Sequence, residues 1–290
     1  MASSGPGFVG IGMQKAGTRW LHDQLQSHPE LWLPLGKELH FFDRGFEPPN
    51  LLLGLRRLGR ALSDEEKADE HDRALWREWL TTQRSVALWR SGGSPVSVDA
   101  LRVYRRMFPS DQRLIAGEIT PAYSGLTKGQ VAAICEGLPR TRFVLLVRHP
   151  ADRLESALGM AQRRRAAVGD DGGPLLQRDT DAVRAYLAEP GVQRRSFPSR
   201  TVPVWQAAAG RRLLVESFDA IRTEPDRTRR RIASFIGVQD LDAFAIAPSY
   251  NRKAGAQKHP LSPEVAELIE ETFAEEVQWC RDHLAFAADW

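Results

Sequence analysis

The feature that most constrains this chain is the stretch FVGIGMQKAGTRWLHDQL at residues 8–25. A short apolar run bounded by glycines predicts a buried strand over Phe8–Ile11. A glycine-bearing turn follows, and apolar residues then recur at helical spacing after Thr18, which we expect to cap the helix. A strand, a glycine loop and a helix N-terminus in this order favour the binding of an anion such as phosphate.

The rest of the chain continues to alternate short apolar runs with helical patterns. Further strands are expected at Leu114–Glu118, in RFVLLV and in RRLLVESF, and helices in GQVAAICEGL, ADRLESALGMAQRRR, EPDRTRRRIASFIGV and EVAELIEETFAEEVQWCRDHL. This order predicts an α/β fold with a parallel sheet flanked by helices. We expect one domain over residues 1–290, with a helical insertion at about 51–91 that covers the sheet or the site.

Composition and charge narrow the class of protein. The chain has 290 residues, of which 42% are hydrophobic and 27% charged, as is ordinary for a globular enzyme. A net charge of +3 is too small to suggest that the whole surface binds nucleic acid. Arginine is nonetheless clustered at 163–165, 194–195, 211–212 and 229–231. Such clusters are usually solvated helix faces, and otherwise they form a rim that attracts an anionic ligand.

The cysteines and the apolar runs argue against disulfide-rich, metal-binding and membrane-spanning proteins. Cys135 and Cys280 are far apart in the sequence, which excludes a disulfide scaffold and offers no metal-ligand spacing. The sequence has no N-terminal leader pattern and no apolar run long enough to cross a bilayer. We therefore expect a cytoplasmic protein without a membrane span.

The lysine of the opening loop stands in an unusual position. Gly12 and Gly17 have the spacing of the nucleotide-binding pattern GxxxxGK[ST], but Thr18 occupies the position of its lysine. Lys15 lies inside the loop instead, where it can reach the bridging or leaving oxygen of a shorter anionic group. The alternative is an ordinary strand–turn–helix junction whose Lys15 points into solvent.

Three segments together, GMQKAGTRWL, SHPEL and KELHFFD, resemble the sulfotransferases that use 3′-phosphoadenosine 5′-phosphosulfate (PAPS). The likeness is nearest to the heparan sulfate sulfotransferase branch and its bacterial relatives, and it extends from about Phe8 to Pro260. The resemblance implies a P-loop-related, Rossmann-like sheet. It also implies transfer of a sulfuryl group from PAPS to a hydroxyl or amine, with 3′-phosphoadenosine 5′-phosphate (PAP) as the other product. No metal is expected, because a sulfuryl group carries less charge than a phosphoryl group.

Contacts to PAPS near the start of the chain follow from this resemblance. Lys15 would stabilise the leaving phosphate, and backbone N–H groups would hold the phosphosulfate. The residues carried over from the family are Lys15, Ala16, Gly17, Thr18, Arg19 and Trp20.

The segment GKELHFFD carries the expected catalytic base. Glu38 and His40 alternate, so an extended backbone would point both side chains to one side, where a carboxylate can take a proton from the acceptor. In the resembled family this glutamate is the base, and the histidine and the following aspartate, here His40 and Asp43, support it. Alternatively, His40 is a structural histidine. Phe41 and Phe42 are expected to belong to the core.

The segment GEITPAYS departs from the family pattern. The position after its glutamate is often a lysine in the family, and here it is Ile119. This difference weakens the case for a glycosaminoglycan-like acceptor and leaves Lys15 as the main cation. Glu118 is either a second carboxylate near the site or a structural group.

PAPS requires a second anion pocket, for its 3′-phosphate. In FVLLVRHPADRLESAL, Arg148 ends a strand and Ser156 lies about one turn into the next helix, and both match the family's 3′-phosphate contacts. Arginine can hold a phosphate with two parallel hydrogen bonds. Arg153 is expected at the surface or in an ion pair.

A basic loop near the C-terminus completes the set implied by the family. In NRKAGAQKHPLSPE, Lys253, Gly255 and Lys258 correspond to a loop that closes over the adenosine phosphates.

The sequence therefore predicts a PAPS-dependent sulfotransferase with Glu38, Lys15 and His40 as catalytic residues. Its partner would be a small-molecule or glycan acceptor, with lipids and secondary metabolites also open, and not a nucleic acid. Two alternatives stay open: a P-loop kinase of a small metabolite, and a degenerate family member that binds a nucleotide without turnover. The sequence does not indicate the oligomeric state.

Overall fold

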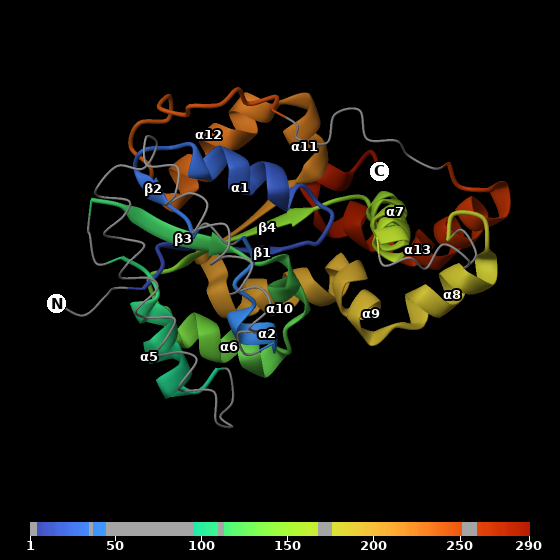
Figure 1. Ribbon diagram of the computed structural model, residues 1–290, viewed down its shortest axis with the longest axis horizontal. Coiled ribbons are helices and arrows are strands. Elements are labelled where there is room, and N and C mark those ends of the chain that lie inside the picture. The colour runs from blue at the N-terminus through green and yellow to red at the C-terminus, as the bar shows by residue number, and fades with distance from the viewer. Residues whose placement is uncertain (1–4, 35–36, 45–95, 110–112, 168–175, 251–259) are drawn as a thin grey trace.

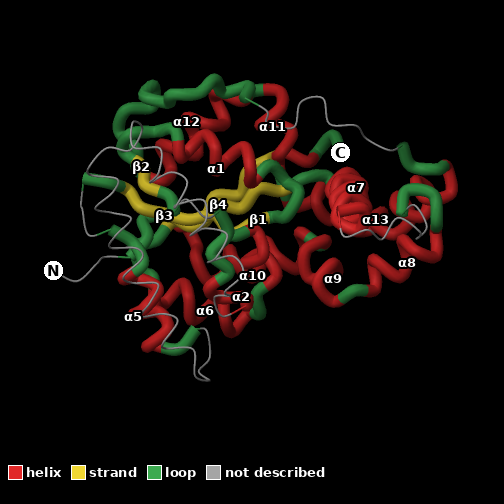
Figure 2. The backbone as a smooth tube through the Cα atoms, viewed as in Figure 1, coloured by secondary structure: helices red, strands yellow, loops and turns green. Residues whose placement is uncertain are grey.

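The computed structural model describes residues 5–34, 37–44, 96–109, 113–167, 176–250 and 260–290. Five strands form one parallel sheet in the order β2-β3-β1-β4-β5. Their bounds are β1 Phe8–Gly12, β2 Leu31–Trp32, β3 Ile115–Ile119, β4 Arg142–Val147 and β5 Leu213–Ser217. The predicted α/β fold, a parallel sheet flanked by helices, is confirmed (Figures 1 and 2).

Helices cover both faces of the sheet (Figure 1). On one face lie α1 (Thr18–Gln26), α11 (Phe218–Thr223) and α12 (Pro225–Ile236), and on the other α5 (Val98–Arg106), α6 (Lys128–Gly137) and α10 (Pro198–Ala209). Beyond the carboxyl end of β4, four helices pack together: α7 (Pro150–Ala167), α8 (Thr180–Ala188), α9 (Pro190–Ser196) and α13 (Pro263–His283). Short elements are α2 (Phe41–Arg44) and the 3-10 helices η1 (Pro121–Gly125), η2 (Gly210–Arg212) and η3 (Ala285–Ala287).

The central strands are buried on both faces. All five residues of β1 are buried, and Phe143–Val147 of β4 have no exposed surface. A strand covered by helices on both sides carries apolar residues at consecutive positions, which is why these runs could be recognised in the sequence. A second apolar cluster, which includes Leu158 of α7, Val183 of α8 and Phe273 of α13, joins the outer helices.

The topology has a switch point at the carboxyl ends of the strands. From β1 the chain runs to β2 and β3 on one side of the sheet, and afterwards to β4 and β5 on the other side. The helices that follow β1 and β3, α1 and α6, lie on opposite faces (Figure 1). The loops after β1 and β3 therefore diverge, and open α/β sheets bind ligands at such a point.

The start of α1 differs from the sequence-based prediction. Its N-cap is Gly17, with a φ of 92°, and Thr18 is the first residue of the helix instead of the cap. A Cβ atom at position 17 would lie 2.9 Å from the Phe218 ring and 3.0 Å from Ile221, so only glycine fits without displacing them. The prediction that Thr18 caps the helix is wrong because tertiary packing requires a residue without a side chain one position earlier.

The arginine clusters lie in solvent only in part. Arg163 and Arg164 are exposed, as expected for a solvated helix face. Arg229 is only 7% exposed, donates a hydrogen bond to the carbonyl oxygen of Ile246 and lies over the Phe244 ring at 4.2 Å. The prediction of a solvated helix face is therefore wrong for Arg229, because its guanidinium contacts the segment that follows α12.

Some expectations fall outside the described ranges. The predicted insertion at about 51–91 lies among residues that the structure does not describe, so the single-domain assignment over 1–290 stays a prediction. Within the described ranges, no helix combines the length and the apolar character that crossing a membrane requires.

Close packing of the sheet predicts an asymmetry between two glycines. At Gly117 in β3, an added Cβ would lie 2.3 Å from the Phe8 ring, whereas at Gly129 in α6 it would meet no atom within 4 Å. We expect Gly117→Ala to lower the free energy of unfolding by about 1–3 kcal/mol through overpacking. Gly129→Ala, the matched control, should raise it by about 0.4–1 kcal/mol. Urea denaturation of both variants measures this, and equal effects would contradict the packing described for β1 and β3.

Candidate active site

The loop between β1 and α1 forms the first part of the site. It follows the carboxyl end of β1 and is tied to β4 by a 2.7 Å hydrogen bond from the Met13 amide to the Leu146 carbonyl oxygen. Lys15 adopts a left-handed backbone with a φ of 72°, and Gly17 does the same at 92°. These two positions turn the loop so that α1 begins close to the carboxyl end of β1. The Lys15 side chain is half-buried.

The N-terminus of α1 carries amide groups that the helix itself does not satisfy. The first intrahelical bond runs from the Leu21 amide to the Gly17 carbonyl oxygen, so the amides of Thr18, Arg19 and Trp20 precede it. Gly17 has no side chain that could cap them, and α1 has no acidic residue in its first turn. The helix dipole adds to this positive potential, so the geometry suits an anion.

The side chains of this stretch are engaged with the protein. Ala16 and Thr18 are buried, and Ala16 offers only backbone groups. The Arg19 Nε lies 3.2 Å from the Asp23 carboxylate, and the Trp20 indole donates to the Pro248 carbonyl oxygen at 2.8 Å. Trp20 can therefore contact a ligand through its ring but not through its N–H group.

Arg148 lies at the carboxyl end of β4, next to the same loop. Its guanidinium is 3.5 Å from the Lys15 carbonyl oxygen and 3.5 Å from the Asp152 carboxylate, and its Cζ stacks over the Phe218 ring at 4.6 Å. Both polar contacts are at the upper limit of hydrogen-bond length, and its buried Nε has no hydrogen-bond partner among the residues that the structure describes. The guanidinium thus keeps donors for an anion. Ser156 lies in the second turn of α7 and is half-buried, slightly further along the helix than expected.

Arg153 is not a surface residue. It is 2% exposed, and its Nη2 donates a 2.7 Å hydrogen bond to Ser196 Oγ. Burial lowers its pKa to about 10, which leaves it charged at neutral pH. The surface prediction is wrong because α9 packs against this side of α7.

Glu38, His40 and Asp43 form a connected chain of side chains. Glu38 Oε2 is 3.4 Å from His40 Nε2, and His40 Nδ1 is 2.9 Å from Asp43 Oδ2. Both ring nitrogens of His40 face a carboxylate, an arrangement in which the protonated ring donates two hydrogen bonds. The backbone is not extended as expected, since Glu38 and His40 have φ angles of 71° and 53°. The two side chains meet because of this left-handed conformation and not because of strand alternation.

Lys37 is a site residue that the sequence reasoning missed. Its Nζ lies 3.0 Å from Glu38 Oε1, and its side chain is only 11% exposed. Burial alone would raise the pKa of the Glu38 carboxyl, but the hydrogen bond from His40 and the charge of Lys37 outweigh it and hold that pKa at about 2. Glu38 is thus ionised throughout the physiological range. The only signal in the sequence was the position of Lys37 directly before the expected base.

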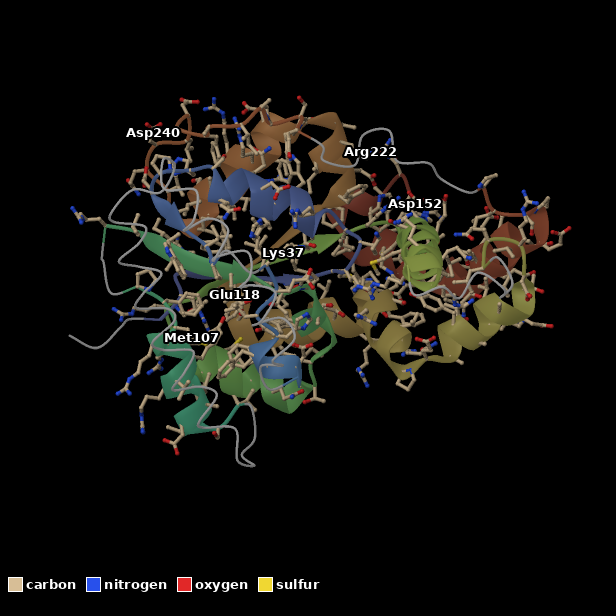
Figure 3. The ribbon with its side chains drawn as sticks, in the orientation of Figure 1. Lys37, Met107, Glu118, Asp152, Arg222 and Asp240 are labelled. Atoms are coloured by element: carbon tan, nitrogen blue, oxygen red, sulfur yellow. The ribbon has the colours of Figure 1, made fainter. Side chains whose placement is uncertain are left out.

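The neighbouring positions of β3 and α2 are buried. Ile119 is 1% exposed and covers Gly10 of β1, so it fills the core where the family often has a lysine. Glu118 is also 1% exposed, within the core beneath the site and not on its surface. Phe41 and Phe42 are buried, as predicted, and their rings pack at 5.2 Å. Figure 3 labels Lys37 and Glu118, which belong to the segment before α2 and to β3.

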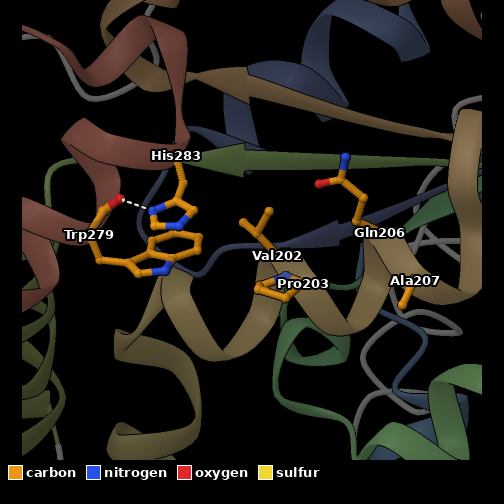
Figure 4. A pocket seen from close by; sticks show the side chains of 6 residues that line it. All are labelled: Val202, Pro203, Gln206, Ala207, Trp279 and His283. Atoms are coloured by element: carbon orange, nitrogen blue, oxygen red, sulfur yellow. Dashed lines mark hydrogen bonds between the residues drawn. The ribbon is translucent and has the colours of Figure 1, made fainter.

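Two further regions complete the comparison with the sequence. Lys253, Gly255 and Lys258 lie outside the described residues. A shallow pocket of about 370 Å³ between α10 and α13 contains no predicted site residue (Figure 4). Its lining consists of Val202, Pro203, Gln206, Ala207, Trp279 and His283. Among the described residues, no group of three or more potential ligands is placed to hold a metal ion.

Comparison with known proteins identifies the class. A sequence model of the sulfotransferase family matches residues 6–243, and the chain therefore belongs to this family. The predicted membership is confirmed at the family level, whereas the nearer likeness to the heparan sulfate branch stays a prediction. No curated protein matches the chain in sequence.

Solved sulfotransferase structures share the fold, and two of them serve as examples. A sulfotransferase from Alicyclobacillus acidocaldarius superimposes with a TM-score of 0.59 at 19% identity, covering 96% of this chain and 94% of that one. Sulfotransferase STF9 from Mycobacterium avium gives a TM-score of 0.52 at 14% identity, covering 96% of this chain and 77% of that one. The P-loop-related sheet expected from the sequence agrees with these structures.

The contact between Lys37 and Glu38 predicts a measurable shift. In Lys37→Met, the loss of the cation should raise the pKa of the Glu38 carboxyl above its value of about 2, while Lys37→Arg, which keeps the charge, should change it little. Carbon-13 NMR of the labelled glutamate carboxyl groups, titrated from low pH, measures this. An unchanged Glu38 titration in Lys37→Met would show that Lys37 does not interact with the carboxylate in solution.

Proposed function

We propose that the protein transfers a sulfuryl group from PAPS to a hydroxyl or amine of an acceptor. One observation carries this proposal. Two groups follow neighbouring parts of one parallel sheet. The segment after β2 carries the connected side chains of Glu38, His40 and Asp43. The segment after β1 carries Lys15 and the uncapped N-terminus of α1. The first group suits proton transfer, and the second suits an anionic donor.

The residues present fit a donor with two separate anionic groups. The uncapped amides at the start of α1 suit the phosphosulfate. Arg148 suits the 3′-phosphate, because its two polar contacts are long and its Nε has no partner within the described ranges. Ser156 is the second group assigned to this phosphate. Because Arg148 touches the Lys15 carbonyl oxygen, the two anion sites are neighbours.

PAPS supplies the sulfuryl group and a phosphate leaving group. The chain's own residues bind the donor, orient the reacting groups and accept a proton from the acceptor. Lys15 stabilises the negative charge that develops on the leaving oxygen. Glu38 Oε2 accepts the proton of the acceptor, and His40, held by Asp43, orients the Glu38 carboxylate. Lys37 keeps Glu38 ionised before the acceptor arrives.

The acceptor is a small molecule or a glycan. The apolar side chain of Ile119 in place of a family lysine argues against a strongly acidic acceptor, since no cation stands at that position. We assign Lys253, Gly255 and Lys258 to closure over the adenosine phosphates on the basis of the family pattern alone.

Ligand-dependent unfolding tests the assignment of the donor. PAP at about 100 times its dissociation constant should add about 2.7 kcal/mol to the free energy of unfolding, and ATP with magnesium should add much less. Arg148→Ala should reduce the PAP effect, because it removes the guanidinium assigned to the 3′-phosphate. The control is Arg164→Ala, which alters an exposed arginine elsewhere on α7. Stabilisation by magnesium-ATP alone would support a kinase instead.

Removal of the Glu38 carboxylate tests the base. Glu38→Gln should lower kcat for sulfuryl transfer from PAPS by about 10²–10⁴-fold, which is the usual contribution of a general base. PAP binding should be unchanged, since Glu38 is not assigned to the donor. Chromatographic measurement of PAP release with a panel of hydroxyl and amine acceptors gives the rate. Full turnover by Glu38→Gln would rule out Glu38 as the base.

A further inference from the structure

Glu118 is a buried carboxylate surrounded by hydrogen-bond donors. Its Oε1 accepts bonds from the hydroxyls of Tyr104 at 2.7 Å and Tyr123 at 2.8 Å, and its Oε2 accepts one from Thr120 Oγ1 at 2.6 Å. The Leu39 amide donates a fourth bond. A carboxylate has about four acceptor positions, so this set saturates it. No ion pair to Glu118 occurs within the described part of the chain.

The partners of Glu118 continue into the segment that carries the base. The Tyr123 hydroxyl, which donates to Glu118, accepts a 3.0 Å hydrogen bond from the Phe41 amide. The Thr120 hydroxyl, which also donates to Glu118, accepts a 3.4 Å bond from the His40 amide. The amides of Leu39, His40 and Phe41 therefore all donate to Glu118 or to one of these two hydroxyl partners.

The backbone of this segment needs such support. Glu38 and His40, with φ angles of 71° and 53°, both adopt a left-handed conformation that costs about 1–2 kcal/mol per residue for side chains other than glycine. Amides in such a turn cannot join a helix or a sheet, so they need acceptors from elsewhere. The side chains of β3 and η1 supply these acceptors.

The direction of every bond in the network depends on the carboxylate. A hydroxyl has one proton, so Tyr123 and Thr120 can accept from the amides of Phe41 and His40 while donating their own proton to Glu118. Burial raises the pKa of Glu118, while the bonds from Thr120, Tyr104 and Tyr123 oppose that rise. In its ionised form Glu118 only accepts hydrogen bonds, and that form orients both hydroxyls toward it.

We propose that Glu118 is a positioning residue for the reaction, acting through Thr120 and Tyr123 to hold residues 39–41 so that Glu38 and His40 meet. The catalytic part of this inference rests on the proposed function of Glu38 as the base. The geometric part does not, because it concerns only the contact between Glu38 and its neighbours. The two parts can be tested separately.

Two tyrosines provide a matched pair of variants. Tyr123→Phe and Tyr104→Phe each remove one buried hydroxyl bonded to the same Glu118 oxygen and keep the ring that packs against Phe42. Only Tyr123 also accepts a bond from the base segment. A purely structural role of the network predicts similar effects of the two variants, whereas a positioning role separates them.

The first measurement is the Glu38 carboxyl titration by carbon-13 NMR in the wild type and both variants. In Tyr123→Phe the pKa should rise from about 2 by roughly one unit or more, because His40 and Lys37 are no longer held against the carboxylate. In Tyr104→Phe it should stay near the wild-type value. Equal titrations in the two variants would overturn the proposal, whatever reaction the protein catalyses.

The second measurement is turnover with PAPS. Tyr123→Phe should lower kcat about tenfold or more with little change in PAP affinity, and Tyr104→Phe should keep kcat within about twofold of the wild type. A fall of the same size in both variants would overturn the positioning role. If Glu38→Gln turns over normally while the NMR titrations separate as expected, the proposed base is wrong but the role of Glu118 in holding the segment stands.

Discussion

β1 pairs in parallel with β3 on one side and β4 on the other, and the groups of the candidate site depend on these two pairings. The loop with Lys15 follows β1, Thr120 and η1 follow β3, and Arg148 follows β4. Parallel strands end at the same edge of a sheet, so residues more than 100 positions apart in the chain lie together there. The candidate anion site and the network beneath Glu38 and His40 thus both depend on the central strand β1.

The charged side chains around Glu38 contact one another directly. Lys37 and His40 flank the Glu38 carboxylate, and Asp43 holds the second nitrogen of His40. Each charged group therefore has a partner of opposite sign, which is the condition for keeping ionised groups in a partly buried place. The arrangement has a chemical consequence. A carboxylate with a pKa of about 2 is a weak proton acceptor, so a substrate that displaces Lys37 or His40 as it binds would make Glu38 a stronger base in the proposed reaction.

Local patterns in the sequence predicted much of the fold. The apolar runs of β1 and β4, the helix α1 and the position of Arg148 depend on residues close in sequence, and the structure agrees with them. Other features depend on distant contacts. The amides of His40 and Phe41, next to the left-handed turns, donate to side chains about 80 positions away. Phe218 rather than Thr18 determines the start of α1. Arg153 is buried by α9, and no local pattern reports that packing.

Phe218 touches both candidate anion sites. One part of its ring leaves room only for glycine at position 17, in the loop before α1, and its face stacks with the Arg148 guanidinium. The distance between the start of α1 and Arg148 is therefore set by a rigid aromatic ring and not by flexible side chains. If both candidate sites bind anions as proposed, the ring fixes their spacing, and the length of a ligand with two anionic ends then matters as well as its charge.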